Sequence, residues 1–384
     1  MRPKCFSVDA MDKIRVCLII PGGIGTGKGN IGIPVLEELV QNLARDVELT
    51  VFSLFKINDG YEAKGFVLTD VQGINLPIKS FVTLWKFWRI HHTVHFDVVH
   101  GCWALPCGFL AVWIGKLFSV RSVVSVLGGD AASLPFIRYG QLRTVLQRKL
   151  VLWTLHQADR RTALTKFSED HLKAAGLRKE VTIIPWGVNT EKFRFIRKPL
   201  HHPVRFLHIA NLSPVKDQAT LLKAFQLISK KVDSELVIMG EGPLEQALKS
   251  LAVQLGIQKQ IVWMGIRPYE DLPQYYHQSD ILLLTSFSEG QSEVATEAMS
   301  SGVVVCGTRV GLLSDVERAC VAVDIGNFQE LARQVLELLE DQPRMEEMRM
   351  HALDWALGHS IGWTAEHTKR LYEGLTDAMQ CESL

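Results

Sequence analysis

The sequence predicts an α/β protein made of two Rossmann-like domains, and three observations support this. The chain has 384 residues, more than a single hydrophobic core usually serves. Apolar runs of strand length alternate with helical patterns, as in a doubly wound parallel sheet. The alternation stops once, at the proline-rich and basic stretch FRFIRKPLHHP, and begins again at VRFLHIA. We therefore expect one domain over residues 1–199 and another over residues 200–359.

The first domain opens with the apolar run IRVCLII at residues 14–20. The glycine loop PGGIGTGKG and the helical pattern IPVLEELVQNLA follow it directly, which predicts a buried parallel strand, a tight loop and a helix. Further strands are expected at VELTVFSL, DVVHG and RSVVSVLGG, with helices around residues 80–93, 105–118, 139–156 and 167–176.

The second domain repeats the pattern with strands expected at SELVIMG, QIVWMG, DILLLTS and VVVCG. The amphipathic stretch IGWTAEHTKRLYEGL predicts a last helix over residues 360–378, which we expect to pack back on the first domain. Ligands of such sheets bind beyond the carboxyl ends of the strands, so the loops after these strands should carry the functional residues.

The composition excludes several classes of protein. A net charge of +1 leaves no overall positive field for nucleic acid, and no segment reaches the roughly 18 apolar residues of a membrane span. The seven cysteines are odd in number and lack CxxC spacing, which is typical of reduced thiols in a cytoplasmic protein.

The stretch FVTLWKFWRIHH combines aromatic and basic residues. Two interpretations stay open for it: ordinary helix packing, or peripheral contact with an anionic membrane.

The stretch LLLTSFSEGQSEVATEAMSSGVVVCGTRVG carries the strongest functional signal. Its glutamates Glu289 and Glu297 stand eight residues apart, so one fits a loop and the other the following helix, where both can border one ligand. Carboxylates accept hydrogen bonds from sugar and ribose hydroxyls, and amides at a helix N-terminus suit a diphosphate. The amides in question belong to Gly290, Gln291 and Ser292.

This segment resembles family 4 of the retaining glycosyltransferases, which have the GT-B fold, two Rossmann-like domains facing each other across a cleft, and an E-x7-E signature. The resemblance covers nearly the whole chain, because several other stretches match in order. These are PGGIG, DVVHGCWALPCGFLA, VVSVLGGD, TALTKFSEDHLKAAG, VTIIPWGVNTEKF, HIANLSPVKDQATLLKAF, MGEGPLEQAL and WMGIRPYEDLPQYYHQSD.

The resemblance implies a metal-independent enzyme without a cofactor. It would move a sugar from a nucleotide-sugar, which we expect to be a UDP-sugar, to a glycan or lipid-linked acceptor. Such a reaction belongs to surface polysaccharide or glycoconjugate synthesis. By this resemblance Glu297 binds the ribose, Glu289 the transferred sugar and Lys216 the diphosphate. A lysine there stabilises the charge that develops on the leaving group. The remaining candidates are Asn211, Gly240, Gly265 and Arg267 on the donor side, and Gly22, Gly23, Gly25, His100 and Asp130 on the acceptor or phosphate side.

Three positions depart from the family pattern. Asn211 stands where the family usually has an arginine, so Arg267 or Lys28 would have to supply that charge. Leu127 stands where relatives often have a histidine, and no role of that imidazole is carried over. Glu293 is an extra acid, to which we assign no catalytic role.

Other interpretations stay open beside this one. GGIGTGK fits the phosphate loop G-x4-G-K, but Gly29 replaces the serine or threonine that would bind magnesium. His100 is also explained as a strand-end histidine and Asp130 as a helix cap. The same fold would also suit a nucleotide-sugar epimerase, a phosphorylase or a non-catalytic partner subunit.

Overall fold

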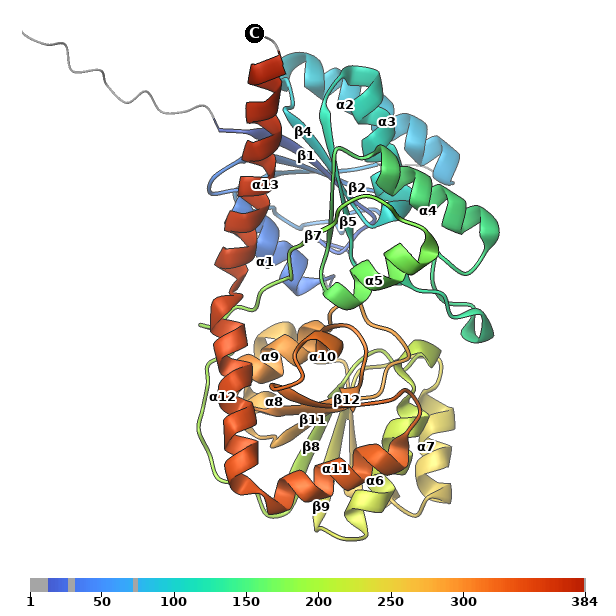
Figure 1. Ribbon diagram of the computed structural model, residues 1–384, viewed down its shortest axis with the longest axis vertical. Helices are drawn as coiled ribbons and strands as arrows, with labels where there is room; N and C mark the ends of the chain where they lie inside the picture. Colours follow the sequence, from blue (N-terminus) through green and yellow to red (C-terminus); the bar gives the residue numbers. More distant parts are fainter. Residues whose placement is uncertain (1–12, 27–31, 72–74, 383–384) are drawn as a thin grey trace, which may run out of the picture.

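A computed structural model of the protein describes residues 13–26, 32–71 and 75–382. It contains two parallel sheets, one above the other along the long axis of the molecule, which confirms the predicted fold class (Figure 1). The strands that the sequence predicted are all present. The structure adds four short strands of two to four residues each, β3 (Val67–Asp70), β6 (Arg160–Ala163), β7 (Thr182–Ile183) and β13 (Cys320–Val323). The first three have no clear apolar pattern, whereas β13 is a short apolar run.

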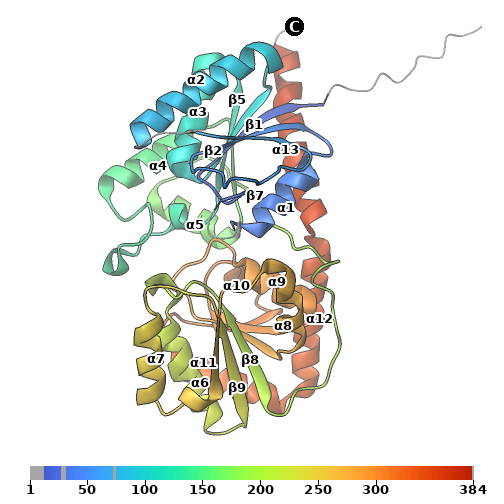
Figure 2. The same ribbon diagram turned by 180° about the vertical axis from the view of Figure 1, so that it is seen from behind.

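The first sheet has seven parallel strands in the order β3-β2-β1-β4-β5-β6-β7. Strand β1 is buried at five successive positions, because helices cover both faces of the sheet. Helices α2, α3 and α4 lie on one face, while α1 and α13 lie on the other (Figures 1 and 2). The strands are β1 (Arg15–Ile20), β2 (Glu48–Ser53), β3 (Val67–Asp70), β4 (Val98–Cys102), β5 (Arg121–Val126), β6 (Arg160–Ala163) and β7 (Thr182–Ile183). The helices are α1 (Pro34–Leu43), α2 (Leu76–Val94), α3 (Phe109–Phe118), α4 (Val145–Gln157), α5 (Lys166–Ala175) and α13 (Ile361–Glu382).

Helix α4 begins later than the pattern around residues 139–156 predicts. The Thr144 side chain accepts a hydrogen bond from the Gln147 amide and caps the helix at its first turn. The residues before it form a loop closed by a bridge between Leu134 and Tyr139. This loop brings Tyr139 toward the second domain, as described below.

The second sheet has six parallel strands in the order β10-β9-β8-β11-β12-β13. Its core is mainly aliphatic and continues into helices α6 (Gln218–Ser229) and α11 (Phe328–Glu340), which pack against each other. The strands are β8 (Val204–Ile209), β9 (Ser234–Met239), β10 (Ile261–Gly265), β11 (Ile281–Leu284), β12 (Val304–Thr308) and β13 (Cys320–Val323). The helices are α6 (Gln218–Ser229), α7 (Glu245–Gln254), α8 (Leu272–His277), α9 (Glu293–Ser301), α10 (Leu312–Asp315), α11 (Phe328–Glu340) and α12 (Gln342–Gly358).

The chain crosses between the domains twice, and the two crossings are bonded to each other. Val188 on the first crossing exchanges backbone hydrogen bonds with His359 and Ile361 on the second. Helix α12 packs on α9 of the second domain, and α13 continues from it along α1 of the first (Figure 1). The last helix therefore belongs to the first domain in space, although it follows the second in sequence.

The cysteines whose side chains the structure describes are thiols within the folded body. The five whose side chains the structure describes are Cys17, Cys102, Cys107, Cys306 and Cys320, and all five are buried and free. Burial raises the pKa of each of these thiols. They are accordingly packing residues with little thiolate character.

Candidate functional site

Lys216 and Glu289 form an ion pair between two loops of the second domain. Lys216 lies on the turn Pro214–Lys216 after β8, and its Nζ is 2.6 Å from Oε1 of Glu289, which follows β11. The Ser286 hydroxyl donates to the same carboxylate oxygen at 2.5 Å. Burial lowers the pKa of Lys216, but the attraction of Glu289 outweighs it and the net shift is upward. The ammonium therefore stays charged at the mouth of the sheet.

Glu297 lies on α9, one helix turn below the loop that holds Glu289. The hydroxyl of Tyr276 on α8 donates to its Oε2 at 2.6 Å. Burial raises the pKa of Glu297 to about 8, against this hydrogen bond, which lowers it. Glu297 thus differs from an exposed carboxylate, because its charge depends on pH near neutrality.

A pocket of about 370 Å³ brings six of the predicted donor residues together at the carboxyl ends of the second sheet. Asn211, Lys216, Gly240, Arg267 and Ser292 line it together with Glu297. The opposite wall is the segment Gly32–Val35 at the start of α1. The pocket is accordingly a cleft between the two domains, with cationic and anionic groups on its second-domain side.

Two glycines with a positive φ shape the backbone at this pocket. A Cβ on Gly240 would lie 2.0 Å from the Ala210 carbonyl oxygen, and the φ of Gly240 is +124°. Gly265 has a φ of +64° and accepts the Gly240 amide at 2.9 Å. Gly265 does not line the pocket, but Ile266 and Arg267, which follow it, do.

Gly290 and Gln291 join the domains and do not line the pocket. The Gln291 side chain accepts the Trp186 amide at 2.8 Å and donates to the Trp186 carbonyl at 2.6 Å. The Gly290 carbonyl accepts the Thr165 hydroxyl of the first domain at 2.8 Å. The Gly290 carbonyl and the Gln291 side chain are thus engaged across the domain boundary. The expected contact of the two backbone amides with a diphosphate stays a prediction.

Replacing Gly290 with alanine is expected to force the domains apart. A Cβ there would lie 2.2 Å from the Leu127 carbonyl oxygen, a backbone atom that cannot give way alone. We expect an increased radius of gyration in small-angle scattering and at least a roughly tenfold loss of turnover, since a misplacement of about 1 Å is this costly in closed sites. The circular dichroism spectrum should not change. Gly374→Ala, where a Cβ meets nothing within 4 Å, is the control. An unchanged radius and rate for Gly290→Ala would contradict this view of the boundary.

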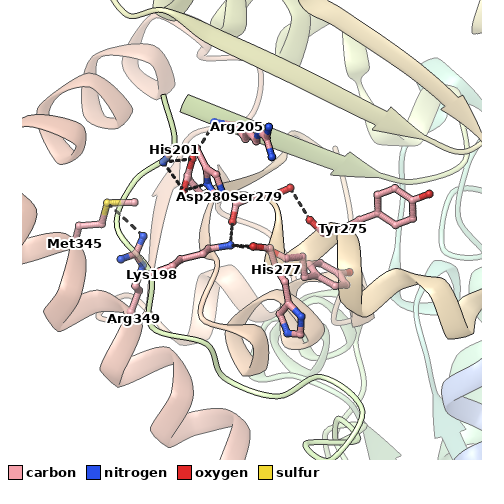
Figure 3. Close-up of polar contacts among 10 residues, drawn as sticks. Lys198, His201, Arg205, Tyr275, His277, Ser279, Asp280, Met345 and Arg349 are labelled. Atoms are coloured by element: carbon pink, nitrogen blue, oxygen red, sulfur yellow. Dashed lines mark hydrogen bonds and ion pairs between the residues drawn. The ribbon is translucent and has the colours of Figure 1, made fainter. Parts of the chain in front are cut away.

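The linker between the domains is bonded to helix α8, whose Tyr276 donates a hydrogen bond to Glu297. Lys198 donates to the carbonyls of Tyr276 and Ser279 at 3.1 and 2.6 Å, and also to that of His277, so it caps the C-terminal end of α8 (Figure 3). Asp280 beside it accepts the backbone amide of Arg205 at 2.9 Å. The position of Tyr276 therefore depends on the hydrogen bonds that Lys198 of the linker donates to the end of α8.

His100 and Asp130 lie inside the first domain, contrary to the sequence-based expectation for the acceptor side. His100 is 5% exposed and bonds the Tyr372 hydroxyl and the Ser125 hydroxyl, both at 2.7 Å. Asp130 is fully buried and accepts the amides of Ala104, Leu127 and Gly128. Both side chains are buried because other segments cover them: α13 packs over His100, and the loop after β5 folds around Asp130.

The first glycine loop supports the pocket wall. Gly23 has a φ of +107°, and its carbonyl accepts the Ile33 amide at 2.6 Å, which fixes the segment Gly32–Val35. A Cβ on Gly22 or Gly25 would meet the rings of Phe55 and Tyr61, so these glycines pack against their own domain. In the described residues the loop contacts protein and does not line the pocket. Lys28 lies outside the described residues.

Three site residues had no sequence signal that identified them. Tyr276 bonds Glu297, and Tyr269 lines the pocket beside it. Burial and the nearby charge of Glu289 raise the pKa of Tyr139, which belongs to the first domain. All three are tyrosines of loops or short helices, and only the packed tertiary structure brings them to the glutamates. Glu293, which we left without a role, also lines the pocket, and burial raises its pKa.

The described residues contain neither a metal-binding cluster nor a membrane-spanning helix. In these residues, no three His, Cys, Asp or Glu side chains gather so that they could hold a metal ion. Metal independence stays a prediction. None of the helices in the described part of the chain is both long and apolar enough to cross a bilayer.

Comparison with known proteins gives a consistent result. Residues 34–192 match the model of "Glycosyltransferase Family 4" and residues 189–355 that of "Glycosyl transferases group 1". The N-acetyl-alpha-D-glucosaminyl L-malate synthase of Bacillus anthracis is 25% identical over 357 residues, 86% of this chain and 88% of the relative. The alpha-monoglucosyldiacylglycerol synthase of Streptococcus pneumoniae is 26% identical, over 74% of this chain and 67% of the relative.

Solved structures show the same fold. Sucrose-phosphate synthase from Thermosynechococcus elongatus superposes with a TM-score of 0.79 at 16% identity, covering 95% of this chain and all of that one. HepE of Anabaena in complex with UDP gives 0.76 at 15% identity, covering 94% of this chain and all of that one. Two Rossmann-like domains, each with a parallel sheet, and a cleft between them define the GT-B fold of glycosyltransferases. By its matches to both family models, the chain belongs to family 4 of these enzymes.

Proposed function

We propose that this chain is a retaining glycosyltransferase that moves a sugar from a UDP-sugar to a glycan or lipid-linked acceptor without a metal ion. The observation that carries the proposal is the Lys216–Glu289 pair at 2.6 Å beside a pocket that Glu297 also lines. A cation, a sugar-binding carboxylate and a ribose-binding carboxylate are the three groups that such a donor requires.

In the reaction, the bond between the sugar C1 and the diphosphate oxygen breaks, and a bond from C1 to the acceptor oxygen forms on the same face of the sugar. Lys216 stabilises the negative charge that develops on the leaving diphosphate, which itself takes the acceptor proton. Glu289 orients the sugar hydroxyls and Glu297 the ribose. Because the site lies between the domains, closure excludes the water that would hydrolyse the donor.

The relatives support the donor and acceptor classes. The names of two of them describe the synthesis of N-acetylglucosaminyl malate and of monoglucosyldiacylglycerol, and HepE was solved with UDP and with UDP-glucose. A mycobacterial relative is named as GDP-mannose-dependent, so GDP-sugars are the second donor class to test. Arg267 and Ile266, which follow β10, form the wall that would meet the base.

A thermal-shift screen of nucleotide-sugars tests the proposal. A donor that binds only the native state raises the melting temperature. At a hundredfold excess over Kd it adds about 2.7 kcal/mol to the free energy of unfolding. We expect a UDP-sugar to give the largest shift, the product anomer to match the donor by NMR, and EDTA to leave turnover unchanged. Stabilisation by none of the sugars would indicate a non-catalytic subunit. Conversion of the donor alone would indicate an epimerase, and a requirement for phosphate a phosphorylase.

A further inference from the structure

Helix α2 carries an exposed aromatic stripe on the outer face of the first domain. Phe81, Trp85 and Trp88 follow one another at helical spacing and are 69%, 44% and 47% exposed. The opposite face of the helix buries Thr83 and Phe87 against the domain. The helix is therefore packed, and its aromatic stripe is an additional feature that packing does not explain.

The neighbouring helices α3 and α4 extend this stripe. Helix α3 packs between α2 and α4 on the same face of the sheet (Figure 2). Trp113 of α3 and Trp153 of α4 have ring centroids 6.3 Å apart, and both rings are partly exposed. We call this set the aromatic surface; its members are Phe81, Trp85, Trp88, Trp113, Leu117, Leu146, Leu150 and Trp153.

Exposed apolar side chains concentrate in this part of the molecule. Of the 21 large apolar residues that are exposed in the described chain, 12 lie between residues 76 and 153. All four exposed tryptophans lie on the aromatic surface. Scattered apolar residues need no explanation, but a concentration of this kind marks an interaction site.

The charge of the same region is strongly asymmetric. Residues 71–158 contain nine lysines and arginines, two aspartates and no glutamate, a net charge of +7 in a chain whose total is +1. Of the two aspartates, Asp130 is buried and Asp97 pairs with Arg15. Helices α2, α3 and α4 thus carry no carboxylate at all.

The cations are exposed and available beside the aromatic rings. Arg89 lies 4.8 Å over the Trp85 ring, and Arg148 and Lys149 project from α4 next to Leu150. Within the described residues, no ion pair involves Arg89, Lys116, Arg138, Arg143, Arg148 or Lys149. Their charges are therefore not neutralised by the protein itself.

We infer that the aromatic surface docks on an anionic lipid bilayer. Tryptophan and phenylalanine rings insert at the boundary between headgroups and acyl chains, and lysines and arginines beside them attract anionic headgroups. A surface with rings, cations and no carboxylate is complementary to such a membrane. This inference goes beyond the proposed function, and it rests on the proposed function only where it concerns the acceptor.

The loop before α4 connects the aromatic surface to the candidate site. Phe136 of this loop is 66% exposed, and its ring lies 5.1 Å from that of Phe287, three residues from the end of β11. Docking through the aromatic surface would therefore bring a lipid-linked acceptor to the edge of the cleft.

Co-sedimentation with vesicles tests the inference without any donor or acceptor. We expect the protein to bind vesicles of phosphatidylcholine mixed with phosphatidylglycerol, to ignore phosphatidylcholine alone, and to dissociate at high salt. Trp85→Ser combined with Trp88→Ser, and Arg148→Glu combined with Lys149→Glu, should each weaken binding by about tenfold or more. Brominated lipids should quench tryptophan emission in the wild type and less in the double tryptophan variant.

Matched controls are available on the second domain. Met350→Ser with Leu357→Ser removes comparable exposed apolar area, and Lys230→Glu with Lys231→Glu reverses the same number of charges. Both should bind vesicles as the wild type does, and so should Lys216→Met, which separates docking from catalysis. Absent or composition-independent binding would overturn the inference, as would wild-type binding by the surface variants. A dimer that only the tryptophan variant loses, without vesicle binding, would assign the face to a second copy.

Discussion

Lys216→Met is expected to lower kcat by roughly two to three orders of magnitude, the loss typical of removing one group that stabilises a developing anion. Methionine keeps an apolar stem of similar length, so the change removes the ammonium and little else. Glu289 keeps the hydrogen bond from Ser286, which holds its carboxylate in position without the lysine. The interaction is strongest in the transition state, and the donor KM should therefore change much less than kcat.

Steady-state rates with the donor from the thermal screen provide the measurement. Lys230→Met, an exposed lysine of the same domain, is the matched control and should retain full activity. The melting temperature of Lys216→Met should stay close to that of the wild type, because Glu289 keeps the hydrogen bond from Ser286. Turnover within a factor of three of the wild type would remove Lys216 from the mechanism.

The sequence was sufficient for features that depend on local pattern. Buried parallel strands read as apolar runs, and the glutamate segment combines a strand, a loop and a helix in direct succession, so its position in the fold follows from the pattern. Lys216 and Glu289 are 73 residues apart in sequence, yet both follow central strands of one sheet, β8 and β11, which pair. Their proximity was therefore predictable from topology alone.

Features that depend on distant packing were not predictable. His100 was assigned to the cleft because it ends a strand, but Tyr372, 272 residues later, covers it. Gln291 was assigned to the donor through its backbone amide, and the sequence did not show that its side chain bonds Trp186 of the first domain. In both cases the deciding contact is made by a segment whose position no periodicity specifies. The tyrosine on Glu297 belongs to the same class, because α8 has only six residues and no pattern of its own.

The raised pKa of Glu297 leads to a second prediction: the affinity for the donor should depend on pH. Ribose hydroxyls donate to the ionised carboxylate, so the donor should bind more tightly as the pH rises toward the free-state pKa of about 8. Glu297→Gln keeps an acceptor for Tyr276 but has no proton to lose. Its donor affinity should be independent of pH and, at pH 9, roughly ten to a hundred times weaker than that of the wild type, since hydrogen bonds to a charged acceptor are the stronger ones.

Titration calorimetry in two buffers of different ionisation enthalpy should show that the wild type releases a proton on binding near pH 7.5 and that Glu297→Gln releases none. Glu340→Gln, an exposed residue of α11, should behave as the wild type. Equal proton release by all three proteins would place the titrating group elsewhere.

The same residue should make stability depend on pH. The pKa of Glu297 is raised on folding from an ordinary value of 4.5 to about 8, so the folded state binds more protons than the unfolded state between these values. Its contribution to the free energy of unfolding must then decrease as the pH rises through that window. The wild type should lose stability relative to Glu297→Gln between pH 5 and pH 8 in denaturant titrations. A constant difference would mean that Glu297 is ionised throughout, and that its buried charge is balanced by groups other than Tyr276.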